Sequence, residues 1–122
     1  MLQTRSERAK DVLITEAMLI HSQWKIGLKL WLDTFNNKSI HFESAMQIRN
    51  VWKNTSGWNV DRIPANKLKP ESQKGPLDIY IFDVHKNQCR IVVWASPKAH
   101  CFFIKAVYSH AEYDKWWKKQ VK

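Results

Sequence analysis

Between residues 78 and 108 the apolar side chains follow a period of two, and this pattern constrains the fold more than any other feature of the chain. Three apolar runs, 78–84, 90–94 and 101–108, are separated only by short turns, the second of which contains Ser96-Pro97. Segments of this length and spacing are typical of neighbouring strands in an antiparallel meander. We therefore expect three strands side by side in this half of the chain.

The first half of the chain has apolar residues at helical spacing instead. One stripe falls at positions i, i+4, i+7, i+8 and i+11 and predicts a core-facing helix: Trp24, Leu28, Trp31, Leu32 and Phe35. The polar segment from Asn36 to Ser39 ends this pattern, and a second amphipathic segment, from about Phe42 to Trp52, predicts another helix. Ahead of both, 11–15 is expected to form a short buried strand with Thr15 as a candidate helix N-cap.

Residues 54–76 hold two of the three Gly and three of the four Pro, which predicts a long irregular connection. Helices followed by consecutive strands define the α+β class. We expect N-terminal helices packed on an antiparallel sheet of three to four strands, with a short C-terminal helix. A polar N-terminal arm over residues 1–10 and one domain over residues 11–122 complete the expected organisation.

The charge of the chain indicates the chemistry of its partner. Lys and Arg number 20 against 11 Asp and Glu, a formal net charge of +9 and a pI near 9.7. Such an excess favours a partner rich in phosphate or carboxylate groups. No apolar run is long enough for a secretory core or a membrane span, so we expect a cytoplasmic protein that does not associate with membranes.

Two cysteines, Cys89 and Cys101, lie on neighbouring predicted strands. Neither belongs to a CxxC or Cys/His spacing, so no metal site and no cofactor is predicted. We expect reduced thiols, and a disulfide between the two strands remains open as an alternative.

The third strand runs directly into a helix whose first residues carry candidate chemistry. Ser109-His110-Ala111-Glu112 fits a capping box, which gives Glu112 a structural role. His110 would then lie in the first turn, where the helix dipole favours a bound phosphate and disfavours imidazolium. Tyr113 and Asp114 follow at helical spacing and can share its face. The alternative is that His110 and Tyr113 are ordinary surface residues of a terminal helix.

Three motifs stand out in this half of the chain: Phe82-Asp83-Val84-His85-Lys86-Asn87-Gln88-Cys89-Arg90-Ile91-Val92-Val93, Phe103-Ile104-Lys105, and Ser109-His110-Ala111-Glu112-Tyr113-Asp114. In this order they resemble the HigB-type toxins of toxin–antitoxin modules. The family has a strand ending Phe-Asn/Asp-Ile, a Gly-Asn turn, Lys-Tyr-Arg, and Thr-His-Ala-Glu-Tyr-Asp at the closing helix. The resemblance covers residues 78–117 well and the preceding helices more loosely, and its most specific part is the final hexapeptide.

The chain departs from that pattern at several places. Lys86 stands where the family commonly has Gly, which carries a cost if the position needs positive φ, and Cys89 replaces the usual Tyr. The connection from Trp58 to Pro76 is longer than usual, and residues 1–10 have no counterpart.

The resemblance implies a small RelE-like fold and an endoribonuclease, an mRNA interferase that acts on the ribosome. It implies attack by the ribose 2′-OH without a metal, and silencing by a helix-turn-helix antitoxin of the HigA type, with operator DNA bound only through that antitoxin. Arg90 is the candidate phosphate ligand, and pairing with Asp83 is its alternative. His110 is the candidate for proton transfer, Tyr113 for proton donation or base stacking, and Asp114 for orientation.

Further RNA contacts are assigned to Lys86, Asn87 and Lys105, each of which has a purely structural or solvated alternative. The Trp116-Trp117 pair among lysines either stacks on RNA or packs on the sheet. Two other functions remain open for the whole chain: a non-enzymatic RNA- or DNA-binding module, and a regulatory subunit that binds an acidic protein.

Overall fold

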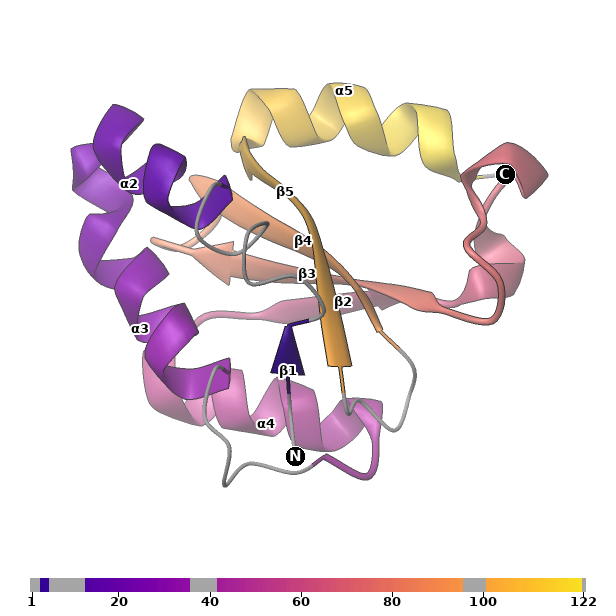
Figure 1. The fold of residues 1–122 in the computed structure, drawn as a ribbon, viewed down its shortest axis with the longest axis horizontal. Coiled ribbons are helices and arrows are strands. Elements are labelled where there is room, and N and C mark those ends of the chain that lie inside the picture. The colour runs from indigo at the N-terminus through magenta and orange to yellow at the C-terminus, as the bar shows by residue number, and fades with distance from the viewer. Residues whose placement is uncertain (1–2, 5–12, 36–41, 96–100, 122) are drawn as a thin grey trace.

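The computed structural model describes residues 3–4, 13–35, 42–95 and 101–121. In chain order the elements are β1 (Gln3–Thr4), α2 (Thr15–Ile20), the 3-10 helix η2 (Ser22–Trp24), α3 (Lys25–Phe35), α4 (Ala45–Ser56), β2 (Val60–Ile63), the 3-10 helices η3 (Ala65–Lys67) and η4 (Pro70–Ser72), β3 (Asp78–Val84), β4 (Cys89–Ala95), β5 (Cys101–Ser109) and α5 (His110–Gln120). Helices α3 and α4 lie on one side of the sheet and α5 on the other (Figure 1). The α+β class is confirmed.

The sheet has the order β1-β5-β4-β3-β2. Strands β2, β3, β4 and β5 pair with one another antiparallel in that order, and β3-β4-β5 form the predicted meander. The short β1 pairs with β5 in parallel, with Gln3 opposite Cys101. The connection predicted over residues 54–76 is wrong in part, because it contains the edge strand β2 as well as the last residues of α4. Only four residues form β2, and the charged Asp61-Arg62 at its centre masks the alternation.

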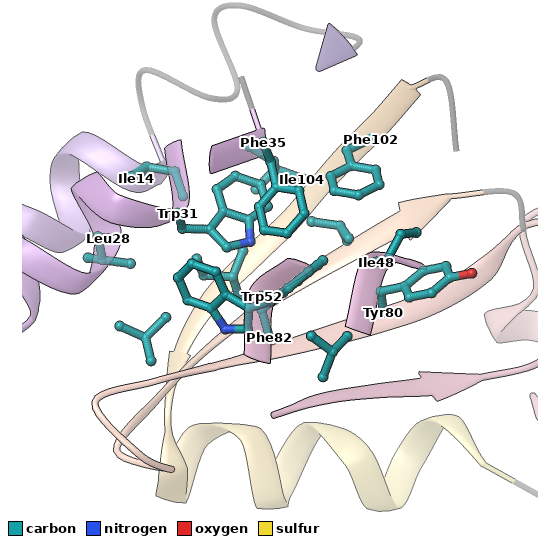
Figure 2. Close-up of a cluster of buried hydrophobic side chains, with 14 of the residues drawn as sticks. Ile14, Leu28, Trp31, Phe35, Ile48, Trp52, Tyr80, Phe82, Phe102 and Ile104 are labelled. Atoms are coloured by element: carbon teal, nitrogen blue, oxygen red, sulfur yellow. The ribbon is translucent and has the colours of Figure 1, made fainter. Parts of the chain in front are cut away.

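Two hydrophobic layers hold the helices against the sheet. The larger lies between α3, α4 and the sheet, where aromatic rings from four elements meet (Figure 2): Trp31, Phe35, Trp52, Phe82 and Phe102, all fully buried. The ring of Phe35 lies 4.9 Å from that of Phe82 and 5.8 Å from that of Trp52, at tilted angles that suit aromatic pairs. The helical stripe predicted from the sequence is therefore core.

The second layer lies under α5. Ile79, Ile81, Val92 and Trp94 of the sheet pack there against Tyr113, with Trp116 and Trp117 at the border. The rings of Trp116 and Trp117 lie 5.9 Å and 6.2 Å from that of Tyr113. Of the two roles considered for Trp116 and Trp117, packing on the sheet is the one that the structure shows.

The N-terminal strand predicted over 11–15 is wrong where the structure describes it. Leu13 and Ile14 form a π-helical turn that leads into α2, and Thr15 is the first residue of that helix instead of its cap. Helical spacing places Ile14 and Ala17 together in the core, which favours a helix over a strand. Residues 11–12, the break at 36–39 and the turn at Ser96-Pro97 lie outside the described residues.

Helix α4 begins later than predicted, at Ala45. The Ser44 hydroxyl caps it by accepting from the backbone N–H of Gln47 at 3.3 Å, and Gly57 ends it in a left-handed conformation with φ of +83°. In the described parts of the chain, no helix is both long and apolar enough to cross a membrane.

Cys101 begins β5, and Cys89 begins β4 beside the other end of β5. Cys89 pairs with Ser109, eight residues along the strand from Cys101, which is roughly 26 Å at the usual rise per residue. A disulfide needs Cα atoms about 6 Å apart, so this fold excludes the bridge. Burial raises the pKa of the Cys89 thiol to about 12, and Cys89 is a protonated core residue.

Helix α3 approaches the hairpin of β3 and β4 at Gly27, which is buried. A Cβ atom at this position would lie 2.5 Å from Cγ1 of Val84 and 3.2 Å from the Trp58 ring. Only glycine permits this approach, which places the end of β3 against the helix.

We predict that Gly27→Ala destabilises the protein by about 1–3 kcal/mol, because the new methyl group collides with Val84. Urea unfolding followed by circular dichroism measures the effect. Helix propensity alone gives the opposite sign, a gain of up to about 1 kcal/mol. Asn54→Ala on an exposed face of α4 is the matched control for propensity, and a Gly27→Ala variant as stable as the parent contradicts the prediction.

Candidate functional site

The hairpin turn after β3 lies directly beside the start of α5. In this turn His85 and Lys86 both adopt positive φ, +52° and +62°. The N–H of Gln88 donates to the carbonyl of His85 at 3.2 Å, and the N–H of His110 donates to the carbonyl of Gln88 at 3.1 Å. The predicted RNA contacts of the turn and the first residue of the helix are thus connected through the backbone.

The capping box at the start of α5 is confirmed. The Ser109 hydroxyl accepts from the N–H of Glu112 at 3.2 Å, and the Glu112 carboxylate accepts from the N–H of Ser109 at 2.9 Å. The bond from the Ser109 backbone lowers the pKa of Glu112. The backbone N–H groups of Ser109 and Glu112 are already bonded within the capping box, and the N–H of His110 donates to the Gln88 carbonyl. Few free N–H groups therefore remain at the helix start to bind the phosphate expected there.

Arg90 is fixed by two contacts on the α5 side of the sheet. Its Nε–H donates to the Asp83 carboxylate across the hairpin at 3.2 Å, and both side chains are about 85% shielded from solvent. Its guanidinium carbon lies 4.4 Å from the centre of the Tyr113 ring, a cation–π geometry. The alternative reading of Arg90 as the partner of Asp83 is confirmed, and the terminal guanidinium nitrogens remain as donors for a ligand.

Burial controls protonation at this site. It raises the pKa of Asp83 although the Arg90 guanidinium opposes the shift. Burial also raises the pKa of Tyr113 to about 12, against Arg90 and with support from nearby carboxylates such as Asp61. The Tyr113 hydroxyl therefore keeps its proton at neutral pH, and Asp83 binds a proton more readily than an exposed carboxylate.

His110 and Asp114 form a pair on the exposed side of the first turn of α5. The Nε2 atom of His110 lies 3.3 Å from a carboxylate oxygen of Asp114, and each side chain is half exposed. His110 is close enough to Asp83 to act on its pKa, as Asp114 is to Tyr113. The structure therefore brings the four predicted catalytic side chains, Arg90, His110, Tyr113 and Asp114, to one corner of the molecule.

A pocket of about 450 Å³ opens at this corner. Its lining combines two cations, one carboxylate, two amides and an aromatic ring: Lys86, Arg90, Asp83, Asn59, Asn87 and Trp58, together with Gly57. Sequence reasoning missed Trp58 and Asn59, which lie in the segment that was predicted to be irregular. Gly57-Trp58 directly after an amphipathic helix was the available signal, because a turn glycine followed by a lone aromatic suits a pocket wall.

Lys105 does not belong to this corner. It lies four residues before Ser109 on β5, about 13 Å along the strand, and lines a separate pocket with Trp94, Lys74 and Gln120. The RNA contact predicted for Lys105 stays a prediction, and it lies outside the pocket lined by Lys86 and Arg90. Across the described residues, no cluster of three or more His, Cys, Asp or Glu side chains is placed to hold a metal ion.

The fold and the hairpin–helix junction together have the features of a small RelE-like toxin. Residues 70–116 match the model of the HigB_toxin family, the RelE-like toxic component of a toxin-antitoxin system. The match contains the junction motifs and confirms, over these residues, the resemblance to HigB-type toxins of the RelE superfamily. A toxin of such a system implies an antitoxin partner. A search of curated proteins found no match to the chain.

We predict that Lys86→Gly stabilises the protein by about 1 kcal/mol, because a side chain at positive φ carries a steric cost that glycine avoids. Urea unfolding measures the gain. Asn87→Gly at the next position is the control, since Asn87 has no positive φ and should lose stability instead. If both variants change the free energy of unfolding equally, the positive φ of Lys86 carries no steric cost.

The raised pKa of Asp83 predicts how stability depends on pH. Its carboxyl holds a proton to higher pH in the folded chain than at its ordinary value of 3.8. Protonated Asp83 therefore stabilises the fold fully below pH 3.8, and this stabilisation is lost as the pH rises through the higher pKa of the folded chain. The stability of the parent minus that of Asp83→Asn should therefore fall from acidic to neutral pH in urea unfolding. A difference that rises with pH contradicts the prediction, and Asp33→Asn on the surface controls for charge loss.

Proposed function

We propose that this toxin is an endoribonuclease that cleaves mRNA on the translating ribosome by 2′-OH attack. The pocket beside the junction carries the proposal, since two cations and a carboxylate with a raised pKa line it next to His110 and Tyr113. Such a site offers what the reaction needs: charge to hold a phosphate, a proton acceptor and a proton donor. The proposed chemistry uses no metal and no cofactor.

The scissile phosphate binds between Arg90 and Lys86 in this proposal. Arg90 is held by Asp83 and by the Tyr113 ring, so its guanidinium is positioned before substrate arrives. Its terminal nitrogens donate to two phosphate oxygens. Lys86 at the tip of the turn supplies a second positive charge near the phosphate.

The cleavage step forms an O2′–P bond and breaks the P–O5′ bond. His110 accepts the 2′-OH proton, held in orientation by Asp114 at 3.3 Å. Tyr113, whose hydroxyl remains protonated, donates to the departing 5′-oxygen. The products are a 2′,3′-cyclic phosphate and a free 5′-OH. Asp83 is the second candidate acceptor, because it lines the pocket and has a raised pKa.

Base contacts come from the walls of the same pocket. Trp58 presents an aromatic surface on which a base can stack, although its ring already stacks on His85 at 5.5 Å. The amides of Asn59 and Asn87 donate to and accept from base edges. The net charge of +9 favours approach to the ribosome, a particle rich in RNA phosphate.

We predict that Tyr113→Phe and His110→Asn each lower the rate of mRNA cleavage at least about 10²-fold, the usual contribution of one acid or base. Purified protein is incubated with mRNA, with and without bacterial ribosomes, and cleavage is followed by primer extension and analysis of the new 3′ ends. Tyr80→Phe is the matched control, because Tyr80 is buried on the opposite face of the sheet. His21→Asn controls for loss of an imidazole.

Each alternative gives a different result in this experiment. Parent-like cleavage by both Tyr113→Phe and His110→Asn overturns the assigned roles. RNA that is bound in a strongly salt-dependent way but stays intact with ribosomes indicates a non-enzymatic binding module. Cleavage without ribosomes retains the endonuclease and overturns ribosome dependence.

A further inference from the structure

A cavity of about 680 Å³, here called the β2–α5 cavity, lies between the end of β2 and the end of α5. The chain after β2 is joined to the helix end, because the N–H of Lys69 donates to the Gln120 carbonyl at 2.9 Å. Apolar side chains, two cations and one amide line the cavity: Ile63, Pro64, Trp117 and Val121, with Arg62, Lys67 and Asn66. None of these described lining residues is acidic, so the cavity favours an anion that has an apolar part.

Arg62 is held in this cavity as Arg90 is held in the candidate site. Its Nε–H donates to the buried carboxylate of Asp78 on β3 at 2.8 Å. The other Asp78 oxygen accepts from the N–H of Ala65 at 2.9 Å, which binds the turn after β2 to the same carboxylate. Apart from a contact with the Tyr80 hydroxyl, the other guanidinium N–H groups remain as donors for a ligand.

Helix α5 places an aromatic ring beside each of the two arginines. Tyr113 rests on Arg90, and Trp117 follows one turn later and lines the β2–α5 cavity. The two rings are stacked, with centres 6.2 Å apart and planes 18° apart. Trp117 is only partly buried, so it packs on Tyr113 and still presents indole surface to the cavity. An Arg–Asp pair near an aromatic ring of α5 thus occurs at both ends of β3.

The spacing between the two sites suits a single strand of RNA. Asn59 lines the pocket that holds Arg90, and Arg62, three residues further along the chain, lines the β2–α5 cavity. Three residues of strand span about 10 Å. A stacked strand of nucleic acid rises about 3.4 Å per nucleotide. About three stacked nucleotides, or fewer when the bases are splayed apart, therefore connect the two sites.

We propose that the β2–α5 cavity binds a nucleotide of the RNA substrate about three positions from the scissile phosphate. Its base stacks on Trp117, and its phosphate binds Arg62 and Lys67. The phosphate lies on the β2 side, away from the C-terminal end of α5, where the helix dipole disfavours an anion. Asn66 offers a donor and an acceptor to the base edge. This role rests on the proposed function, because the nucleotide belongs to the substrate of that reaction.

The lining of the cavity favours a nucleotide over simpler ligands. An apolar side chain of a protein would cover the indole of Trp117 and leave the donors of Arg62 and Lys67 without an acceptor. Inorganic phosphate would bind those donors and leave the apolar walls in water. A nucleotide has a planar ring for the walls and an anionic group for the cations. Selection of RNA by this toxin then depends partly on a base outside the cleaved bond.

Binding of an RNA that cannot be cleaved tests the subsite. A 2′-O-methyl pentaadenylate has no free 2′-OH for attack, and NMR titration of the ¹⁵N-labelled protein measures its affinity. We expect the indole N–H signal of Trp117, assigned by its loss in Trp117→Leu, to shift with the same affinity as the amide signals of Lys86 and Asn87. An unchanged Trp117 signal overturns the proposal. If adenosine monophosphate shifts that signal at equally low concentration, the cavity binds free nucleotides and the RNA subsite is wrong.

Three variants test the assigned contacts. Trp117→Leu should weaken pentaadenylate binding about tenfold and Lys67→Gln about threefold or more, the losses expected for one stacked base and one phosphate contact. Lys67 is exposed, so its variant retains the fold. Lys25→Gln removes an equal charge from an exposed lysine that lines neither site, and should bind like the parent. Equal affinity of the two lysine variants overturns the proposal.

These measurements separate the subsite from the nuclease itself, because they record binding without cleavage. A protein that binds the pentaadenylate in this way and never cleaves mRNA retains the subsite and contradicts the proposed function. A protein that cleaves mRNA while its Trp117→Leu and Lys67→Gln variants bind like the parent retains the nuclease and overturns the subsite.

Discussion

The ion pair between Asp83 and Arg90 is the interaction on which the candidate site, at the junction of the β3–β4 hairpin and α5, depends. It joins β3 to β4 at the hairpin end and provides the cation on which the Tyr113 ring of α5 rests. A partly buried pair of this kind gives little net stability, because desolvation offsets the attraction. Its effect is geometric: it fixes the guanidinium and sets the place where α5 meets the sheet.

The same corner is restrained from the opposite face. The indole N–H of Trp52 donates to the backbone carbonyl of Asp83 at 2.9 Å, and Gly27 allows α3 to pack against Val84. Asp83, which binds Arg90, is thus itself bound by α4, and its neighbour Val84 packs against α3. The aromatic core therefore contacts the polar site directly, and substitutions that disturb packing in the core should also displace the side chains of the site.

Much of this arrangement follows from short-range patterns in the sequence. The period of two from residue 78, the stripe from Trp24 to Phe35 and the capping box at Ser109 each depend on neighbours a few residues apart, so local physics specifies them. The strand β2 is different: Val60 and Ile63 are buried only because β3 lies beside them. The turn into α2 at Ile14 likewise depends on a distant core. Tertiary contacts decided both elements, and no local pattern contains them.

The candidate site divides in the same way. Helical spacing allowed His110, Tyr113 and Asp114 to share a face, and the strand register placed Arg90 opposite Asp83. These local patterns did not predict that Asn59 would line the pocket, because its position depends on the pairing of β2 with β3. The dipole argument for a phosphate at the helix start was local and incomplete, because the Gln88 carbonyl from another segment takes up the His110 amide.

The pocket is assembled from two stretches of chain that differ in what constrains them. Asp83, Lys86, Asn87 and Arg90 come from the hairpin, where the ion pair and the turn restrict each side chain. Trp58 and Asn59 come from the segment between α4 and β2, and neither takes part in the Asp83–Arg90 ion pair or in the capping box of α5. In the proposed function, substitutions at these two positions reshape the wall that faces the bases and leave the reacting groups in place. Substrate preference and chemical competence are then separable, and one can drift while the other is maintained.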